Sequence, residues 1–313
     1  MFTFPGDVLA AFDGLTSTIG CNFDGGFIWG IPEMFFDAAL LWRVDVPERR
    51  ISSTQISRIS IPTWSWMALE GPFIDNSWRG GSNYISDLRA SHPDHFGTIP
   101  ILQWFSIERD SGRRRPILST WRKYFNCRKG DALPQGWEAH MPETSSGNPS
   151  HFTSESVPDV VFWYPIPIRE QPTTDNIGAP ANLIACRTQR AYLVRAVRER
   201  EKGRYWRSLS HVLLTNQNKW AGALHEDVLD QSSARGTCEL IAISAGHESD
   251  YHVTRYGARW VTDKVLHSRI VFEYFNVLWI EWKDGIAYRK GIGKVLKDKW
   301  EALELEWIDV ILG

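Results

Sequence analysis

Two tryptophan motifs hold the residues of this sequence best suited to bind a ligand. Trp64 and Trp66 stand two positions apart, so in an extended chain both indole rings lie on one side. Trp279 and Glu281 repeat that spacing near the carboxyl end. Two flat rings offer a stacking platform, although large aromatic side chains more often fill a protein interior. We take Trp64, Trp66, Trp279 and Glu281 as candidate binding residues, with core packing as the alternative.

Carboxylates near the carboxyl-terminal tryptophans suggest glycoside chemistry. That chemistry needs two carboxyl groups about 5 to 10 Å apart on either side of a sugar, and a sequence does not give this separation. Charged residues that alternate with apolar ones also form the solvated face of a sheet. A Trp-rich carbohydrate-binding or glycoside-processing β domain stays open as an alternative function. The carboxylates concerned are Glu281, Glu304, Glu306 and Asp309.

Two further motifs with catalytic or phosphate-binding residues are incomplete. Ser244 lies in AISAGH, which lacks the first glycine of GxSxG and a following amphipathic helix, so we expect a strand-end hydroxyl. The run GIGK at Gly291 to Lys294 lacks the ending of a phosphate-binding loop, and we expect a bulge or bend in a strand. The sequence therefore predicts no catalytic residue and no enzyme activity.

Histidines and cysteines show no metal-binding pattern. The pairs His92 with His95 and His247 with His252 have no cysteine or carboxylate partners at the spacing of a metal site. The cysteines are scattered, which fits free thiols in a reducing compartment. We expect no metal and no cofactor. The cysteines are Cys21, Cys127, Cys186 and Cys238.

The composition indicates a globular cytoplasmic protein. A net charge of -2 argues against nucleic acid as a partner, and the one basic tract, Arg187 to Arg207, is expected to be a solvated hairpin. Apolar runs such as Val157 to Ile168 are too short to span a membrane. No basic residue precedes Arg43, so we expect no secretory signal. The 16 Trp among 313 residues suit a sheet-rich core or an aromatic binding surface.

Helices and turns are expected in the amino-terminal part. Asp7 is a suitable N-cap for an amphipathic helix that closes at Gly20. The glycines around Trp29 predict a turn that needs positive φ, and a helix of about three turns is expected from Pro32 to Trp42. Ile61 to Trp66 reads as an edge strand. Trp29 and Trp42 are expected to be structural.

Short β-rich runs dominate after residue 157. The clearest hairpin is WIEWKDGIAYRKG, in which Asp284-Gly285 supplies the two-residue turn. A short helix is expected around Lys297 to Leu303, followed by a last strand that ends at Leu312. We expect Trp282, Trp307 and Gly285 to be structural. The other runs are Val160–Trp163, Leu183–Thr188, Tyr192–Val197, Val212–Thr215 and Cys238–Ser244, separated by turn residues. Before residue 157, Ile99–Ile107 also reads as a strand.

These elements predict an α+β fold, with short helices first and then a mostly antiparallel β domain that resembles a sandwich or a barrel. We expect three regions: 1–71 with the helices and the tryptophan pair, 72–156 as a variable, loop-rich stretch, and 157–313 as the β domain. The Ser/Thr/Pro/Gly/Asn-rich run from Pro142 to Ser156 marks the expected boundary.

Several of these runs resemble one known family. GGFIWGIPEMFFDAALLW followed by PTWSW, the run FNVLWIEWKDGIAYRKGIGKV and the ending EWIDVILG are similar to the downstream part of fungal heterokaryon-incompatibility (HET) domain proteins. The opening FTFPGDVLAAFDGL also resembles a segment of that family. The defining amino-terminal module of the family, with LSYxWG and WIDxxCIxQ segments, does not occur in these 313 residues.

The resemblance implies a role for the chain. The family module has been compared with TIR domains, some of which hydrolyse NAD, so any catalysis is expected in that module. The region matched here is expected to be a non-enzymatic accessory or interaction region that binds another protein. Its implied setting is fungal nonself recognition and programmed cell death.

Overall fold

The computed structural model describes most of the chain. The described residues are 25–44, 61–69, 96–108, 111–142, 148–167, 181–197, 210–227, 235–249 and 271–313, with Phe12, Gly14, Thr16, Gly20, Phe23 and Tyr84. Most of the helix expected after Asp7 lies outside them. Phe12, Gly14, Thr16 and Gly20 are helical, and the Thr16 hydroxyl donates a hydrogen bond to the Phe12 carbonyl at 2.7 Å.

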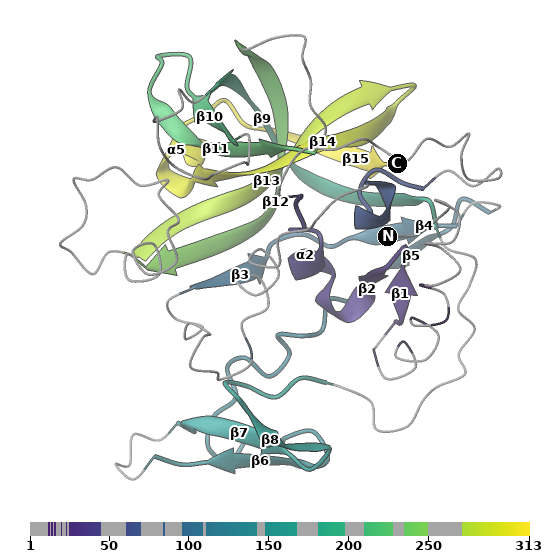
Figure 1. Ribbon diagram of the computed structural model, residues 1–313, viewed down its shortest axis with the longest axis vertical. Helices are drawn as coiled ribbons and strands as arrows, with labels where there is room; N and C mark the ends of the chain where they lie inside the picture. The colour runs from purple at the N-terminus through teal and green to yellow at the C-terminus, as the bar shows by residue number, and fades with distance from the viewer. Residues whose placement is uncertain are drawn as a thin grey trace.

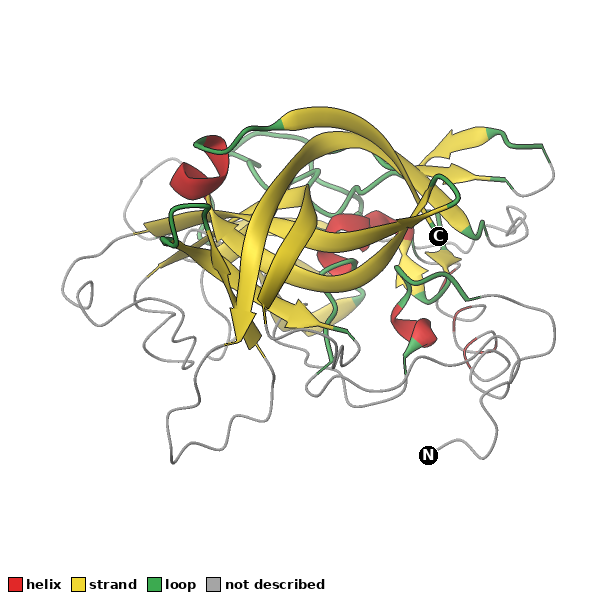
Figure 2. Ribbon diagram, turned by 90° about the horizontal axis from the view of Figure 1, so that it is seen from above, coloured by secondary structure: helices red, strands yellow, loops and turns green. Residues whose placement is uncertain are grey.

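Six antiparallel strands close into a barrel. Each strand pairs with the next in the order β9, β12, β13, β14, β11, β10, and β10 pairs with β9 again. Figure 2 shows these long, curved strands from above. The expected antiparallel β domain is confirmed. The strands are β9 (Leu183–Val197), β10 (Ser210–Leu214), β11 (Trp220–Glu226), β12 (Arg235–Ser249), β13 (Val271–Lys283) and β14 (Ile286–Leu296).

Strand β9 is continuous, and the prediction of two separate strands at 183–188 and 192–197 was wrong. Its first half pairs with β15 (Glu306–Leu312), and its second half pairs with β12 and β10. Arg190 has partners on both sides, opposite Glu306 and Ile241. The polar residues in mid-strand therefore mark a change of neighbours and not a turn.

Shorter strands extend the sheet. β4 (Phe105–Ile107) pairs with the start of β9 on one side and with β5 (Arg114–Pro116) on the other, while β3 (Phe96–Pro100) pairs with β12. The single strand expected over 99–107 is thus two strands on different neighbours. The short helix α5 (Lys297–Glu301) precedes β15, as expected.

The β13–β14 hairpin forms as predicted. Lys283 pairs with Ile286, and Asp284 and Gly285 have φ angles of 53° and 77°. Two positive φ values are the geometry of a tight two-residue turn whose twist matches the strands. A bulge lies opposite Trp279, and a Cβ on Gly291 would stand 2.3 Å from the His225 carbonyl oxygen. The expected bulge at these glycines is confirmed.

The amino-terminal segment covers one outer side of the barrel (Figure 1). It contains β1 (Phe27–Ile28), β2 (Ile31–Pro32), the 3-10 helix η1 (Glu33–Phe35), α2 (Phe36–Ala39) and the 3-10 helix η2 (Trp66–Ala68). The turn at Trp29 and Gly30 has φ angles of 48° and 74°, as predicted. The helix is shorter than the expected Pro32–Trp42.

The strand expected over Ile61 to Trp66 is a turn that leads into η2. The Ser65 hydroxyl accepts a hydrogen bond from Met67 N at 3.1 Å and donates one to the Trp29 carbonyl at 2.8 Å. These bonds compete with strand pairing, since a serine side chain offers the backbone an alternative partner.

Three clusters of buried side chains form the core. The first lies between the amino-terminal segment and the outer barrel face, and the second lies inside the barrel. The third joins Met34 and Phe35 to a separate sheet of β6 (Trp137–His140), β7 (His151–Ser154) and β8 (Val157–Phe162). β7 and β8 pair with each other, so the boundary expected at 142–156 falls inside this sheet.

Among the described residues, no helix is long and apolar enough to cross a membrane.

Candidate functional site

The four candidate binding residues do not form one site. Trp64 is fully buried in the outer core cluster, and Trp279 is 9% exposed in the barrel interior. Trp66 is half-buried, and its indole nitrogen donates to the Gly30 carbonyl at 3.0 Å. Glu281 is exposed and pairs with Lys290 at 3.4 Å. No ligand can stack on Trp64 in this arrangement, so its ring is a core residue.

The residues expected to be structural divide into two groups. Trp29 and Trp42 are each 8% exposed, and the Trp42 indole donates to the Trp64 carbonyl at 2.9 Å. Trp282 and Trp307 lie at the surface, with 36% and 58% of their area exposed. Their strands are structural, but these two indole rings are available for contact.

A buried arginine clamps the amino-terminal segment to the barrel. Arg289 on β14 is fully buried and donates to Asp227 through Nε at 2.8 Å. It also donates to the carbonyls of Leu40 at 3.0 Å and Trp42 at 2.6 Å, and its guanidinium lies 3.5 Å from the centre of the Trp42 ring. The clamp requires an intact 25–44 segment, which makes that segment part of the same folded unit.

A charged cluster occupies the barrel interior beside Trp279. Arg195 forms an ion pair with Glu226, and its guanidinium lies 4.8 Å from the Trp279 ring centre. His211 Nε2 is 3.7 Å from Glu226, and burial lowers the pKa of His211, so the imidazole is neutral near pH 7. Burial raises the pKa of the Cys238 thiol to about 12, so this thiol is not a nucleophile.

Asp37 is a buried carboxyl on α2. It is 2% exposed, and burial raises its pKa from 3.8 to about 6, although Ser119 and Trp104 lower it in part. Asp37 therefore makes the seam between α2 and the 104–119 segment sensitive to pH.

Other polar residues of the sheet make structural hydrogen bonds. Ser244 is fully buried within β12 and accepts a hydrogen bond from the Asn276 amide at 2.9 Å, so it is a mid-strand residue and not a strand-end hydroxyl. Burial and the nearby cations Arg43 and Lys294 lower the pKa of His225 to about 3, and its neutral ring faces Arg43 at 2.7 Å. His92, His95 and His252 lie outside the described residues, as does Arg198–Arg207 of the basic tract.

Part of the outer barrel face carries a partly exposed aromatic and charged surface, here called the Arg190 patch: Arg190, Tyr192, Glu239, Trp282 and Glu306. Arg190 bonds Glu239 at 3.0 Å and also pairs with Glu306. Trp282 donates to Glu239 at 2.8 Å, and the Arg190 guanidinium lies 5.6 Å from the Tyr192 ring centre. Tyr192 is 47% exposed. Three strands, β9, β12 and β13, hold the patch, and β15 supplies Glu306.

The glutamates expected near tryptophans have separate roles. Glu306 neutralises Arg190, whereas Glu281 pairs with Lys290. Asp309 lies opposite Arg187 in the β15–β9 pairing. Glu304 lies in the connection between α5 and β15. Among the described residues, no group of three or more metal-ligating side chains is present.

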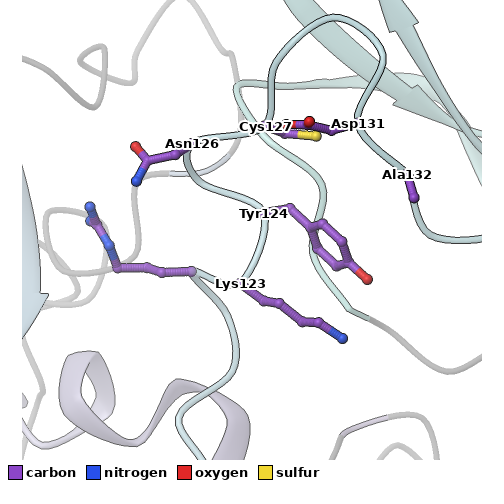
Figure 3. Close-up of a pocket in the computed structure, with 7 residues that line it drawn as sticks. Lys123, Tyr124, Asn126, Cys127, Asp131 and Ala132 are labelled. Atoms are coloured by element: carbon purple, nitrogen blue, oxygen red, sulfur yellow. The ribbon is translucent and has the colours of Figure 1, made fainter.

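A small pocket of about 190 Å³ lies under the 122–132 loop (Figure 3). Lys123, Tyr124, Asn126, Cys127 and Asp131 surround it. Burial and Asp131 raise the pKa of the Cys127 thiol, which therefore stays protonated near neutral pH. The pocket has polar walls but no activated nucleophile.

Comparisons with known proteins returned no relative. No protein-family model, no curated protein and no solved structure matches this chain.

Proposed function

We propose that this chain is a non-enzymatic, protein-binding region of a HET-type protein that acts in fungal nonself recognition and cell death in the cytoplasm. The Arg190 patch is the observation that carries a binding role. Tyr, Trp and Arg are the residue types most enriched where protein interfaces derive their energy. The HET assignment rests on the sequence resemblance.

The structure of the patch favours recognition by a preformed surface. Arg190 is held from two sides by Glu239 and Glu306, and Glu239 also fixes the Trp282 indole. Side chains that are already ordered lose less entropy on binding, so the same contacts give a higher affinity. Strands hold the patch, and strands position side chains more firmly than loops do.

The test is a cell-death assay in a filamentous fungus that produces the chain during an incompatible fusion. We expect the double variant Tyr192→Ala with Trp282→Ala to lose the response, while Leu118→Ala, at an exposed residue outside the patch, keeps it. If the patch variant responds like the wild type, the binding role of this surface is wrong. NAD breakdown by the purified chain, abolished by a point change within it, would contradict the non-enzymatic assignment.

A carbohydrate ligand is the second candidate, because Trp282 and Tyr192 expose ring area on the same face. Tryptophan fluorescence during sugar titration, together with a glycan array, tests it. No array signal and no fluorescence change would remove this candidate.

A further inference from the structure

The hairpin of β6 and β7 brings together two histidines that do not belong to any recognised sequence motif. His140 lies directly opposite His151 in the strand pairing. Their rings are stacked, with centres 4.5 Å apart and planes inclined by 10°. Ala139 and Phe152, the neighbours on the other face, pack into the third core cluster. The histidine pair therefore lies on the face of the small sheet that points away from this cluster. Figure 1 shows the hairpin of β6 and β7 in this sheet.

Hydrogen bonds favour one protonation pattern of His151. The Ser150 hydroxyl lies 3.0 Å from both the His140 carbonyl and His151 Nδ1, and when it donates to the carbonyl its oxygen accepts from Nδ1. The proton of the neutral ring then sits on Nδ1, and Nε2 carries a lone pair. This nitrogen is the one that a metal ion could bind.

His140 is arranged in the same way from the other strand. Its Nε2 atom is 2.8 Å from the Thr153 hydroxyl, which can donate or accept; in the tautomer in which it accepts, the proton is on Nε2 and the lone pair is on Nδ1. Each ring thus has one nitrogen held by a hydroxyl and one available as a ligand. Metal-binding histidines characteristically use the second nitrogen in such a bond, which fixes the tautomer and the ring orientation.

We propose that His140 and His151 form a two-histidine site for a divalent transition metal ion of the zinc, copper and nickel class. Imidazole nitrogen suits these ions, whereas magnesium and calcium prefer oxygen ligands. The two rings are nearly parallel, so metal binding requires both to turn about χ2, a soft torsion, until the lone pairs converge at about 2.0 to 2.1 Å from the ion. This turn replaces the stacked arrangement and changes the contacts with Ser150 and Thr153. Water fills the remaining coordination positions.

The charge state of the pair agrees with this role. Burial, and next to it the neighbouring His140, lower the pKa of His151 from its usual value. A neutral ring is available to a metal near pH 7, and protonation competes with binding as the pH falls. Two ligands fix the ion weakly and leave it open to a further ligand from outside the hairpin.

Binding is measured on the full chain by calorimetry with Zn²⁺, with Mg²⁺ as the negative control and EDTA to reverse it. We expect one ion per chain, with affinity that falls at acid pH because a protonated imidazole does not bind a metal ion. His140→Asn and His151→Asn should each weaken binding at least about tenfold, the smallest loss typical even of outer-shell changes. His247→Asn, on β12, is the matched control and should bind like the wild type.

A second measurement needs no variant. Ni²⁺ should broaden the NMR signals of the His140 and His151 rings before those of any other described histidine, because the paramagnetic ion sits between them. Absence of Zn²⁺ binding at millimolar concentration overturns the proposal. Binding that His140→Asn and His151→Asn leave unchanged, or broadening centred on other residues, overturns it equally.

Discussion

Two arginines on the outer face of the barrel are used differently. Arg289 is fully buried under the amino-terminal segment, where it pairs with one carboxylate and donates to two backbone carbonyls. Arg190 lies in a partly exposed region, where two glutamates pair with it and two partly exposed aromatic rings lie nearby. The covered region around Arg289 contributes to stability, whereas the open region around Arg190 leaves side chains accessible to solvent. The following experiments compare the two regions.

Loss of Arg289 should have the largest effect. Arg289→Ala leaves Asp227 buried without its partner and removes the clamp on the Leu40 and Trp42 carbonyls. Breaking a buried pair in this way costs about 3 to 5 kcal/mol of unfolding free energy. A solvent-accessible pair, such as that of Arg190 with Glu306, whose side chain is 61% exposed, contributes about 0 to 1 kcal/mol. Urea denaturation of Arg289→Ala and Arg190→Ala measures both. Equal losses would contradict the difference drawn between the covered and the open region.

Tryptophan truncation should follow the same division. Trp64→Ala empties a fully buried site and should cost about 3 to 5 kcal/mol. Trp307→Ala, at a ring that is 58% exposed, should change stability by about 0.5 kcal/mol or less. The midpoint of chemical denaturation reports both values. An unchanged midpoint for Trp64→Ala would show that this ring is not part of the core.

Asp37 should make the stability of the covered amino-terminal region dependent on pH. Its pKa is raised from 3.8 to about 6 in the folded chain, so the native state favours the protonated form. The associated stability is fully present below pH 3.8 and is lost as the pH rises through 6, by about 2 to 3 kcal/mol in total. Asp37→Asn should therefore be more stable than the wild type at pH 7.5 and lack this slope. Parallel stability curves of the two proteins between pH 5 and 8 would contradict the assignment.

Changes in the Arg190 patch should have the smallest effect on stability. Tyr192→Ala with Trp282→Ala removes partly exposed rings, and we expect a loss of about 1 kcal/mol or less. Thermal unfolding and far-ultraviolet circular dichroism check that the fold persists. A loss as large as that of Trp64→Ala would show that the patch supports the barrel and would weaken its use as a binding surface.

Local sequence patterns correctly predicted one hairpin and the tight turns, but they did not show which strands pair across long distances in the sequence. The Asp284-Gly285 turn, the turn at Trp29 and Gly30, and helix α5 were predicted correctly, because their geometry depends on a few adjacent residues. The stretch around Arg190 was predicted to separate two strands, but it lies within β9, where the neighbouring strand changes from β15 to β12. No local sequence pattern distinguishes a turn from such a change of neighbours.

Sequence reasoning was limited in the same way for the candidate binding residues. Trp64 and Trp66 were paired as strand neighbours, but Ser65 bonds replace the strand with a turn. The Arg190 patch combines residues from four strands, and its members are separated by up to 116 positions in the chain. The His140–His151 pair was missed because the sequence contains no motif at that spacing, although a predicted hairpin over Trp137 to Ser154 would have aligned them.

The sequence by itself determined the β-rich character, the tight turns and the apolar strands, since each follows from the preferences of neighbouring residues. Only the tertiary structure decided which strands meet, that six of them close into a barrel, and which tryptophans lie inside it. It also decided that Arg289 is covered while Arg190 is open. Burial depends on what packs against a residue from elsewhere in the chain, and neighbouring residues carry no record of that contact.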